Sequence, residues 1–229
     1  MNDIALQSEA ATFSADLTAL QALGLYTGVS DAYIALMTSE GTSTTPPTYD
    51  TPFLACESTE IGLTPTYAEG QQAASNRTIR KRKMLTGMTT KISYPRMVAE
   101  KKAKILGHVM ANGNEILGDK AQPKCAVGVC ETRDDGTMVM RWILQGEFSE
   151  GEVTATTEED DTLSYTIPTL EHAGVRVPYR MSIGNGAYMR PVEIICDTAL
   201  EANQAVTPEK FFAAVPDLSK LAEGLTTGG

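Results

Sequence analysis

The sequence predicts a mainly β fold, namely a β-sandwich or small barrel with one flanking α-helix. Three observations lead to this prediction: short segments alternate apolar and polar residues, glycine-containing turns separate several of them, and only one central segment has a convincing helical period. The chain has 229 residues, which is enough to bury one large all-β core without a structural metal or a disulfide.

The N-terminal part predicts a flexible arm followed by a strand and a loop. Apolar residues recur at helical spacing in residues 12–24, so a short helix is expected within the arm, residues 1–30. The first strand is expected at residues 31–38. Residues 39–52 are rich in Ser, Thr, Gly and Pro, which disfavour a regular element. A loop of this length is uncommon in a compact domain and usually serves a contact.

The middle of the chain predicts one strand and one helix. Residues 86–94 place Met88, Thr90 and Ile92 on one face of a half-buried strand. After Pro95 the period changes to that of a helix, over residues 96–106, and Gly107 can end it.

Two hairpins are expected in the second half. Residues 124–131 and 137–144 flank an Asp-Gly pair, which tolerates the positive φ of a tight turn. Residues 175–183 alternate most clearly, and the turn at Asn185-Gly186 is expected to lead into a partner strand, residues 188–196.

Three parts of the chain are therefore expected. Residues 1–30 form the N-terminal arm, and residues 31–174 form the β-domain. Residues 175–229 form a C-terminal extension with an edge hairpin, because it contains Pro178 and Pro191, and with a helix that starts at Thr207-Pro208-Glu209.

Charge and hydropathy exclude several classes of protein. The formal net charge is -10 and the isoelectric point is near 4.7, which disfavours a general DNA-packaging protein that would neutralise phosphates. The N-terminus lacks the pattern of a secretory signal, and the longest strictly apolar run, residues 34–37, is far too short to span a membrane. We expect a cytosolic chain with no membrane contact.

Enzymatic motifs are missing, so we expect no catalytic activity, no cofactor and no metal. The sequence has no phosphate-binding loop, no nucleophile elbow and no HExxH motif. Cys125 and Cys130 are five positions apart on a predicted strand and would point to opposite faces. His108, at a helix end, and His172, in a predicted turn, are expected to be solvated.

Two other classes stay open as alternatives. One is a cysteine hydrolase that would pair Cys56 or Cys196 with His108 or His172. The other is a monomeric carbohydrate-binding or adhesin-like β-module, although the chain has only one Trp for a sugar-binding groove.

Two charged clusters are candidate interaction sites. Three interpretations of the basic cluster are open: it contacts nucleic acid, it is an edge strand that its charges protect from wrong pairing, or it forms an interface with an acidic neighbour. Its residues are Arg77, Arg80, Lys81, Arg82 and Lys83. The acidic cluster lacks the spacing of a calcium-binding loop, so a calcium site is not expected there. We interpret the cluster as a plain acidic turn or as the acidic side of the same interface. Its residues are Glu147, Glu150, Glu152, Glu158, Glu159, Asp160 and Asp161.

Residues 31–174 also resemble a known family. AYIALMTSEG precedes the Pro/Thr-rich loop, MLTGMTTKISYP forms the basic strand, and MVAEKKAKILGH forms the helix. The most specific stretch is QPKCAVGVCETRDDGTMVMRWILQGEFSEGEVTATTEEDDTLSYTIPTLEH. In order and spacing these segments resemble the major tail (tail tube) proteins of long-tailed siphophages and related prophages.

The resemblance implies a tail-tube-like β-domain that assembles into hexameric rings, which stack into a tube through which DNA passes without specific binding. It implies the phage tail as the location, assembly in the host cytoplasm, and the tape-measure and tail terminator proteins as partners. A tube of a phage-derived particle or secretion system is a related alternative. The carboxylates of the acidic cluster are candidates for the lumen or an interface.

The resemblance also implies that the long loop reaches a neighbouring ring. The candidate inter-ring residues are Ser39, Glu40, Thr45, Pro46, Pro47, Tyr49 and Asp50.

Overall fold

A computed structural model describes residues 23–74, 77–151 and 167–226 of the chain. These residues form a mainly antiparallel β structure with a few short helices, so the predicted mainly β class is confirmed. The sheet runs from β3 to β5 without joining its two ends, and it is therefore not a closed barrel. The helix expected within residues 12–24 lies almost entirely outside the described residues.

The elements follow one another in this order. The first strands are β1 (Tyr26–Val29), β2 (Ala32–Ser39), β3 (Thr48–Tyr49), β4 (Phe53–Cys56), β5 (Glu60–Ala74) and β6 (Arg77–Ser93). Helix α2 (Ala99–Leu106) precedes β7 (Val109–Ala111), β8 (Asn114–Ile116), β9 (Cys125–Arg133), β10 (Met138–Glu150) and β11 (Thr169–Val175). The last elements are β12 (Met181–Ser182), β13 (Tyr188–Met189), β14 (Glu193–Asp197), η1 (Glu201–Asn203), α3 (Pro208–Phe211) and α4 (Leu218–Thr226).

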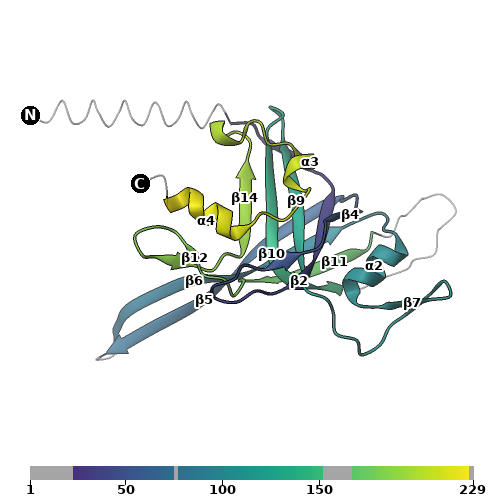
Figure 1. Ribbon diagram of the computed structural model, residues 1–229, viewed down its shortest axis with the longest axis horizontal. Coiled ribbons are helices and arrows are strands. Elements are labelled where there is room, and N and C mark those ends of the chain that lie inside the picture. The colour runs from purple at the N-terminus through teal and green to yellow at the C-terminus, as the bar shows by residue number, and fades with distance from the viewer. Residues whose placement is uncertain (1–22, 75–76, 152–166, 227–229) are drawn as a thin grey trace, which may run out of the picture.

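Strand β10 organises the sheet because it changes partners along its length. It pairs with β9 on one edge, while its other edge pairs first with β14 and then, from Gly146 onward, with β11. The sheet continues from β11 to β6 and β5, and Figure 1 shows this second part crossing the upright strands β9, β10 and β14.

Two glycines allow the backbones to approach each other where β10 changes partners. Gly146 and Gly174 are register partners in β10 and β11. A Cβ on Gly174 would lie 2.5 Å from the Met88 carbonyl oxygen and 2.6 Å from Cγ2 of Ile143. Larger residues do not fit this crossing without a shift of the backbone.

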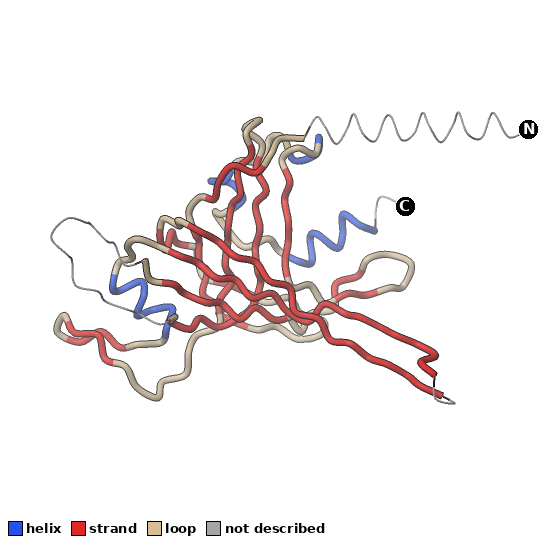
Figure 2. The backbone as a smooth tube through the Cα atoms, turned by 180° about the vertical axis from the view of Figure 1, so that it is seen from behind, coloured by secondary structure: helices blue, strands red, loops and turns tan. Residues whose placement is uncertain are grey.

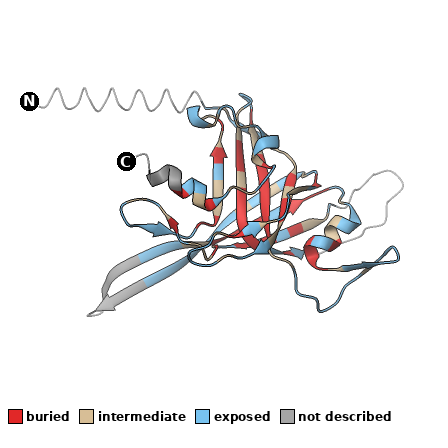
Figure 3. Cartoon of the chain, viewed as in Figure 1, coloured by how far each residue is buried: buried red, intermediate tan, exposed pale blue. Residues whose placement is uncertain are grey.

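The central strands are buried on both faces, as the red segments of Figure 3 show. On one face, Ile34, Val127, Ile143 and Phe148 form a core with Ile105 of α2 and residues of β6 and β11. This core lies between the central strands and the part of the sheet that crosses them.

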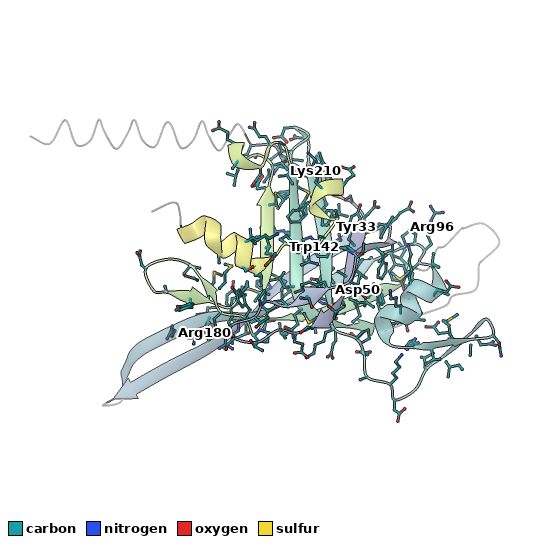
Figure 4. All side chains as sticks on the ribbon, viewed as in Figure 1. Tyr33, Asp50, Arg96, Trp142, Arg180 and Lys210 are labelled. Atoms are coloured by element: carbon teal, nitrogen blue, oxygen red, sulfur yellow. The ribbon has the colours of Figure 1, made fainter. Side chains whose placement is uncertain are left out.

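The C-terminal residues build a second core on the other face. Phe212 stacks on Tyr33 with 4.4 Å between ring centroids, and it meets Trp142 edge-on at 5.6 Å. The Trp142 indole N–H donates to the Phe211 carbonyl oxygen at 3.2 Å, and Leu218 of α4 adds to the cluster. Figure 4 shows Tyr33 and Trp142 among the central strands beside this C-terminal segment.

Several expected elements are confirmed. The Asp-Gly hairpin joins β9 to β10, with Gly136 at a φ of 81°. The predicted helix is α2, which ends where Gly107 adopts a φ of 74°. Strand β6 includes the predicted residues 86–94 but begins at Arg77. A helix also begins after Thr207, with Pro208 as its first residue.

The hairpin expected from residues 175–183 and 188–196 is wrong. Only β12 and β13 pair with each other, two residues each, across a turn in which Asn185 has a φ of 48°. Strand β14 pairs with β10 instead, because residues 138–143 of β10 offer it a longer ladder, while Pro178 supplies no N–H donor. The C-terminal extension thus contributes a sheet strand and half of the second core.

The close approach of the strands at Gly174 predicts that two Gly→Ala substitutions differ in their effect on the free energy of unfolding. Gly174→Ala is expected to lower the free energy of unfolding by about 1–3 kcal/mol, because its Cβ collides with backbone that cannot rotate away. Gly62→Ala in β5 is the control, since its Cβ would meet only Lys91 Cβ at 3.8 Å, and it should be neutral or slightly stabilising. Urea denaturation of both variants measures the difference; equal stabilities would contradict the proposed close approach.

The second core predicts a large cost for one aromatic residue. Phe212→Ala is expected to lower the free energy of unfolding by about 3–5 kcal/mol, because the ring is buried between Tyr33 and Trp142. Phe211→Ala is the matched control and should cost clearly less, since that side chain is half-buried and its backbone carbonyl remains. Thermal and urea unfolding compare the two, and a loss for Phe212→Ala no larger than that for Phe211→Ala would contradict the central place of Phe212 in this core.

Candidate assembly surface

The β5–β6 hairpin extends beyond the rest of the sheet as a two-stranded ribbon, which Figures 1 and 2 show from opposite sides. Strand β11 pairs with β6 only from Gly87 to Ser93. Among the described residues, β5 is therefore the only strand beside residues 77–85. The side chains of residues 64–70 and 82–84 are exposed. The ribbon consequently has open edges and no core of its own beneath these residues.

Interactions within the ribbon are weak. Lys83 forms an ion pair with Glu69 at 3.5 Å and lies 4.4 Å from the centroid of the Tyr67 ring, but both partners of the ion pair are about 60% exposed. Exposed pairs of this kind contribute about 0–1 kcal/mol. Tyr67 and Met84 remain 46% and 44% exposed. Since two isolated strands are marginally stable in water, the described contacts within the ribbon contribute little to its stability.

The ribbon is the basic end of an acidic chain. Residues 67–83 contain five cationic side chains and the single carboxylate Glu69, so their net charge is +4. Because the whole chain has a net charge of -10, all other residues together carry -14. The backbone register sets Lys81 and Arg80 opposite Gln71 and Gln72. The predicted basic cluster is therefore one strand of the ribbon, facing mostly uncharged residues of β5.

The long loop, residues 39–52, is held against its own sheet. The Tyr49 hydroxyl donates to the Leu144 carbonyl oxygen at 2.8 Å, and burial raises the pKa of this phenol. Glu40 pairs with Lys124 at 2.7 Å and accepts a hydrogen bond from Gln145. Two residues of the loop, Thr48 and Tyr49, form strand β3.

The loop still presents some residues to solvent. Pro47 is buried and Pro46 is half-buried, whereas Ser39, Thr45 and Asp50 are exposed; Asp50 is labelled in Figure 4. The segment is therefore anchored by Glu40, Pro47 and Tyr49, and its contact with a neighbouring ring stays a prediction.

The acidic cluster begins at the end of β10. Glu147 is exposed, whereas Glu150 forms an ion pair with Lys102 of α2 and raises the pKa of that ammonium. The other members of the cluster lie outside the described residues: Glu152, Glu158, Glu159, Asp160 and Asp161. The cluster thus starts beside α2, at the end of the molecule away from the ribbon (Figure 1).

The four cysteines are buried free thiols. Burial raises the pKa of Cys56 to about 11 and that of Cys125 to about 12, and it also raises the pKa of Cys196. Thiols with such pKa values are protonated at neutral pH and are poor nucleophiles.

Neither histidine is hydrogen-bonded to a thiol in the described part of the chain. His108 Nδ1 lies 2.6 Å from Oε1 of Glu115. His172 is in β11, not in a turn, and it is fully buried, so the expectation that it is solvated is wrong. Its Nε2 lies 3.2 Å from the Cys125 carbonyl oxygen, and Phe148 packs on its ring. The cysteine hydrolase alternative therefore gains no support from this geometry.

The described segments contain no group of three His, Cys, Asp or Glu side chains that could hold a metal ion. No described helix is both long enough and apolar enough to cross a membrane. No protein-family model matches the chain, and no curated protein matches its sequence.

Sequence analysis missed half of the ribbon. It did not predict β5, although Ile61, Leu63 and Tyr67 alternate with polar residues and gave a usable signal. Tyr67 and Met84, the exposed apolar residues of the ribbon, were not singled out.

Buried His172 predicts a specific dependence of stability on pH. Burial lowers its pKa from 6.5 to about 4, so the unfolded chain takes up a proton at a higher pH than the folded protein. The free energy of unfolding should therefore fall as the pH drops from about 6.5 to about 4, by roughly 3 kcal/mol from this group.

The comparison of two variants measures this contribution. In His172→Gln the decline between these pH values should be smaller than in the native protein, whatever the cost of the substitution itself. His108→Gln, which leaves the buried ring in place, should retain the decline. Urea denaturation at several pH values gives the slopes; an unchanged slope in His172→Gln would contradict the assignment.

Proposed function

We propose that the chain is a structural subunit that assembles with copies of itself into hexameric rings stacked into a tail tube, the conduit for DNA delivery in a long-tailed phage. The observation that carries the proposal is the β5–β6 ribbon, in which residues 64–70 and 82–84 are exposed and which has no further strand along its edges among the described residues. A long exposed strand edge is a template for pairing with another chain, and a ring of identical subunits supplies that partner to every copy.

The sequence and the fold support the proposal independently. The resemblance of residues 31–174 to tail tube proteins supplies the hexameric ring, the stacked tube, and the tape-measure and tail terminator partners. The acidic balance of the chain suits a conduit, since DNA is repelled by a wall of like charge and adheres to a basic one. A tube in a phage-derived particle or secretion system would use the same subunit contacts.

The structure separates the ribbon from the core, so assembly and folding are expected to respond differently to its removal. Ala68 and Met84 are register partners, and the described side chains beyond them, those of Glu69, Gly70, Arg82 and Lys83, are exposed. Replacing residues 69–83 with Asn-Gly therefore joins the two strands through a short turn without removing a described buried side chain.

We expect the native protein to form rings or tubes when it is concentrated, and the shortened variant to remain a folded monomer of similar thermal stability. Negative-stain electron microscopy and light scattering after gel filtration measure assembly, and circular dichroism measures folding. Asn112→Asp, in the turn between β7 and β8, is the control and should assemble normally. A native protein that stays monomeric at every concentration would refute the proposed function.

A further inference from the structure

A pocket of about 840 Å³ lies beside the base of the ribbon, between β6, the residues that follow β11, and the β12–β13 hairpin. Three arginines line it: Arg176, Arg180 and Arg190. We propose that this pocket binds the acidic segment of a second copy of the chain, namely the part of residues 147–161 that follows β10, residues 152–161. The proposal deepens the assembly function above and rests on it.

The three arginines lack compensating charge. None of them forms an ion pair with a carboxylate among the described residues, although Glu193 also lines the pocket. Glu193 is directed to Arg141, at 3.5 Å. A guanidinium carries five N–H donors that match a carboxylate in a two-pronged contact, so these side chains are suited to acidic ligands.

Neighbouring residues orient two of these arginines. The Arg180 guanidinium lies 5.6 Å from the centroid of the Tyr188 ring, and the Arg180 backbone N–H donates to the Ser43 carbonyl oxygen at 3.0 Å. Arg176 Nη1 lies 3.4 Å from the Met84 sulfur. Figure 4 places Arg180 where the ribbon joins the rest of the molecule. The charges are therefore held at the pocket by contacts that do not neutralise them.

The apolar lining indicates a peptide segment as the ligand. Tyr188 and Met189 are 60% and 44% exposed, and Met84 of the ribbon is exposed to a similar extent. Aromatic and methionine side chains around a few charged groups are typical of surfaces that bind protein segments. A pocket of this volume also has room for several residues of an extended chain.

Residues 147–161 supply the complementary charge. They contain seven carboxylates and no basic residue, and five of the seven carboxylates follow β10 in the sequence. Their start is fixed beside α2 by the ion pair between Glu150 and Lys102, and both Figure 1 and Figure 2 show α2 and the β12–β13 hairpin at opposite ends of the molecule. The acidic segment of one copy thus starts at the end of the molecule opposite its own arginine pocket.

Two different surfaces at opposite ends define a head-to-tail contact. Such a contact repeats from copy to copy and closes into a ring or continues as a filament, whereas a two-fold dimer would need one self-complementary surface. The arginine pocket and the acidic segment therefore account for the direction of assembly, while the ribbon supplies an open strand edge.

Reciprocal charge reversal tests the contact. The pocket variant carries Arg180→Glu and Arg190→Glu, and the segment variant carries Glu158→Lys, Glu159→Lys, Asp160→Lys and Asp161→Lys. Each variant alone should fail to form rings or tubes, because like charges then face each other. An equimolar mixture should assemble, since each reversed surface meets its complement. Lys120→Glu with Lys220→Glu adds the same charge as the pocket variant at exposed positions elsewhere and should assemble as the native protein does.

A binding measurement keeps the test independent of assembly. A fluorescent peptide of residues 152–161 should bind the folded, non-assembling segment variant, and binding should weaken at least about tenfold when the pocket substitutions are added. The same peptide with Gln and Asn in place of its carboxylates should bind equally weakly. Circular dichroism of each variant confirms folding.

The outcomes separate the two proposals. Native tubes together with normal assembly of both variants, or a mixture that does not recover assembly, would overturn the pocket contact and leave the proposed function intact. A native protein that never assembles would refute the proposed function, and the peptide titration would still decide whether the pocket binds acidic segments.

Discussion

The fold depends on the close approach of β10 and β11 at Gly146 and Gly174. A Cβ on Gly146 would lie 2.5 Å from Nε2 of His172, and one on Gly174 would lie equally close to the backbone of β6. Because neither glycine has a side chain, three strands cross with their backbones nearly in contact, and β10 can exchange β14 for β11. His172 occupies the space beside Gly146, where its ring is buried and meets the Cys125 carbonyl oxygen. The crossing divides one sheet into two parts that face each other.

That division determines where the apolar residues are used. The central strands are covered on one face by the crossing strands and α2, and on the other by the C-terminal segment with Phe212 and Leu218. The described ribbon beyond β11 contributes no buried side chain to either core. The core of the described residues is therefore formed without the ribbon, so the proposed assembly through the ribbon would be separable from folding.

The sequence predicted those elements whose signals are local. The Asp-Gly turn and the helix ending at Gly107 were found because turn chemistry and capping act over a few residues. The hairpin prediction from residues 175–183 was wrong because alternation identifies a strand but not the strand with which it pairs. Strand β14 pairs with β10, about fifty residues away in sequence. The burial of His172 and the arginine pocket could not be predicted, because each depends on segments that only the sheet topology brings together. The basic residues were identified, and an edge strand was among their predicted settings, but the long two-stranded ribbon was not predicted.

Under the proposed assembly, the separation of positive and negative charge would allow an acidic protein to associate with itself. Identical copies with a charge of -10 repel each other at long range, but salt screens that repulsion within about 8 Å, so contacts decide the outcome. The ribbon, with a net charge of +4 over residues 67–83, and the arginine pocket lie at one end of the molecule. The acidic segment, residues 147–161, begins at the opposite end, beside α2. Parallel alignment of two copies would bring like charges together, whereas head-to-tail alignment pairs opposite ones. A monomeric binding module would gain nothing from this arrangement, since it would leave both charged ends and both ribbon edges without a partner.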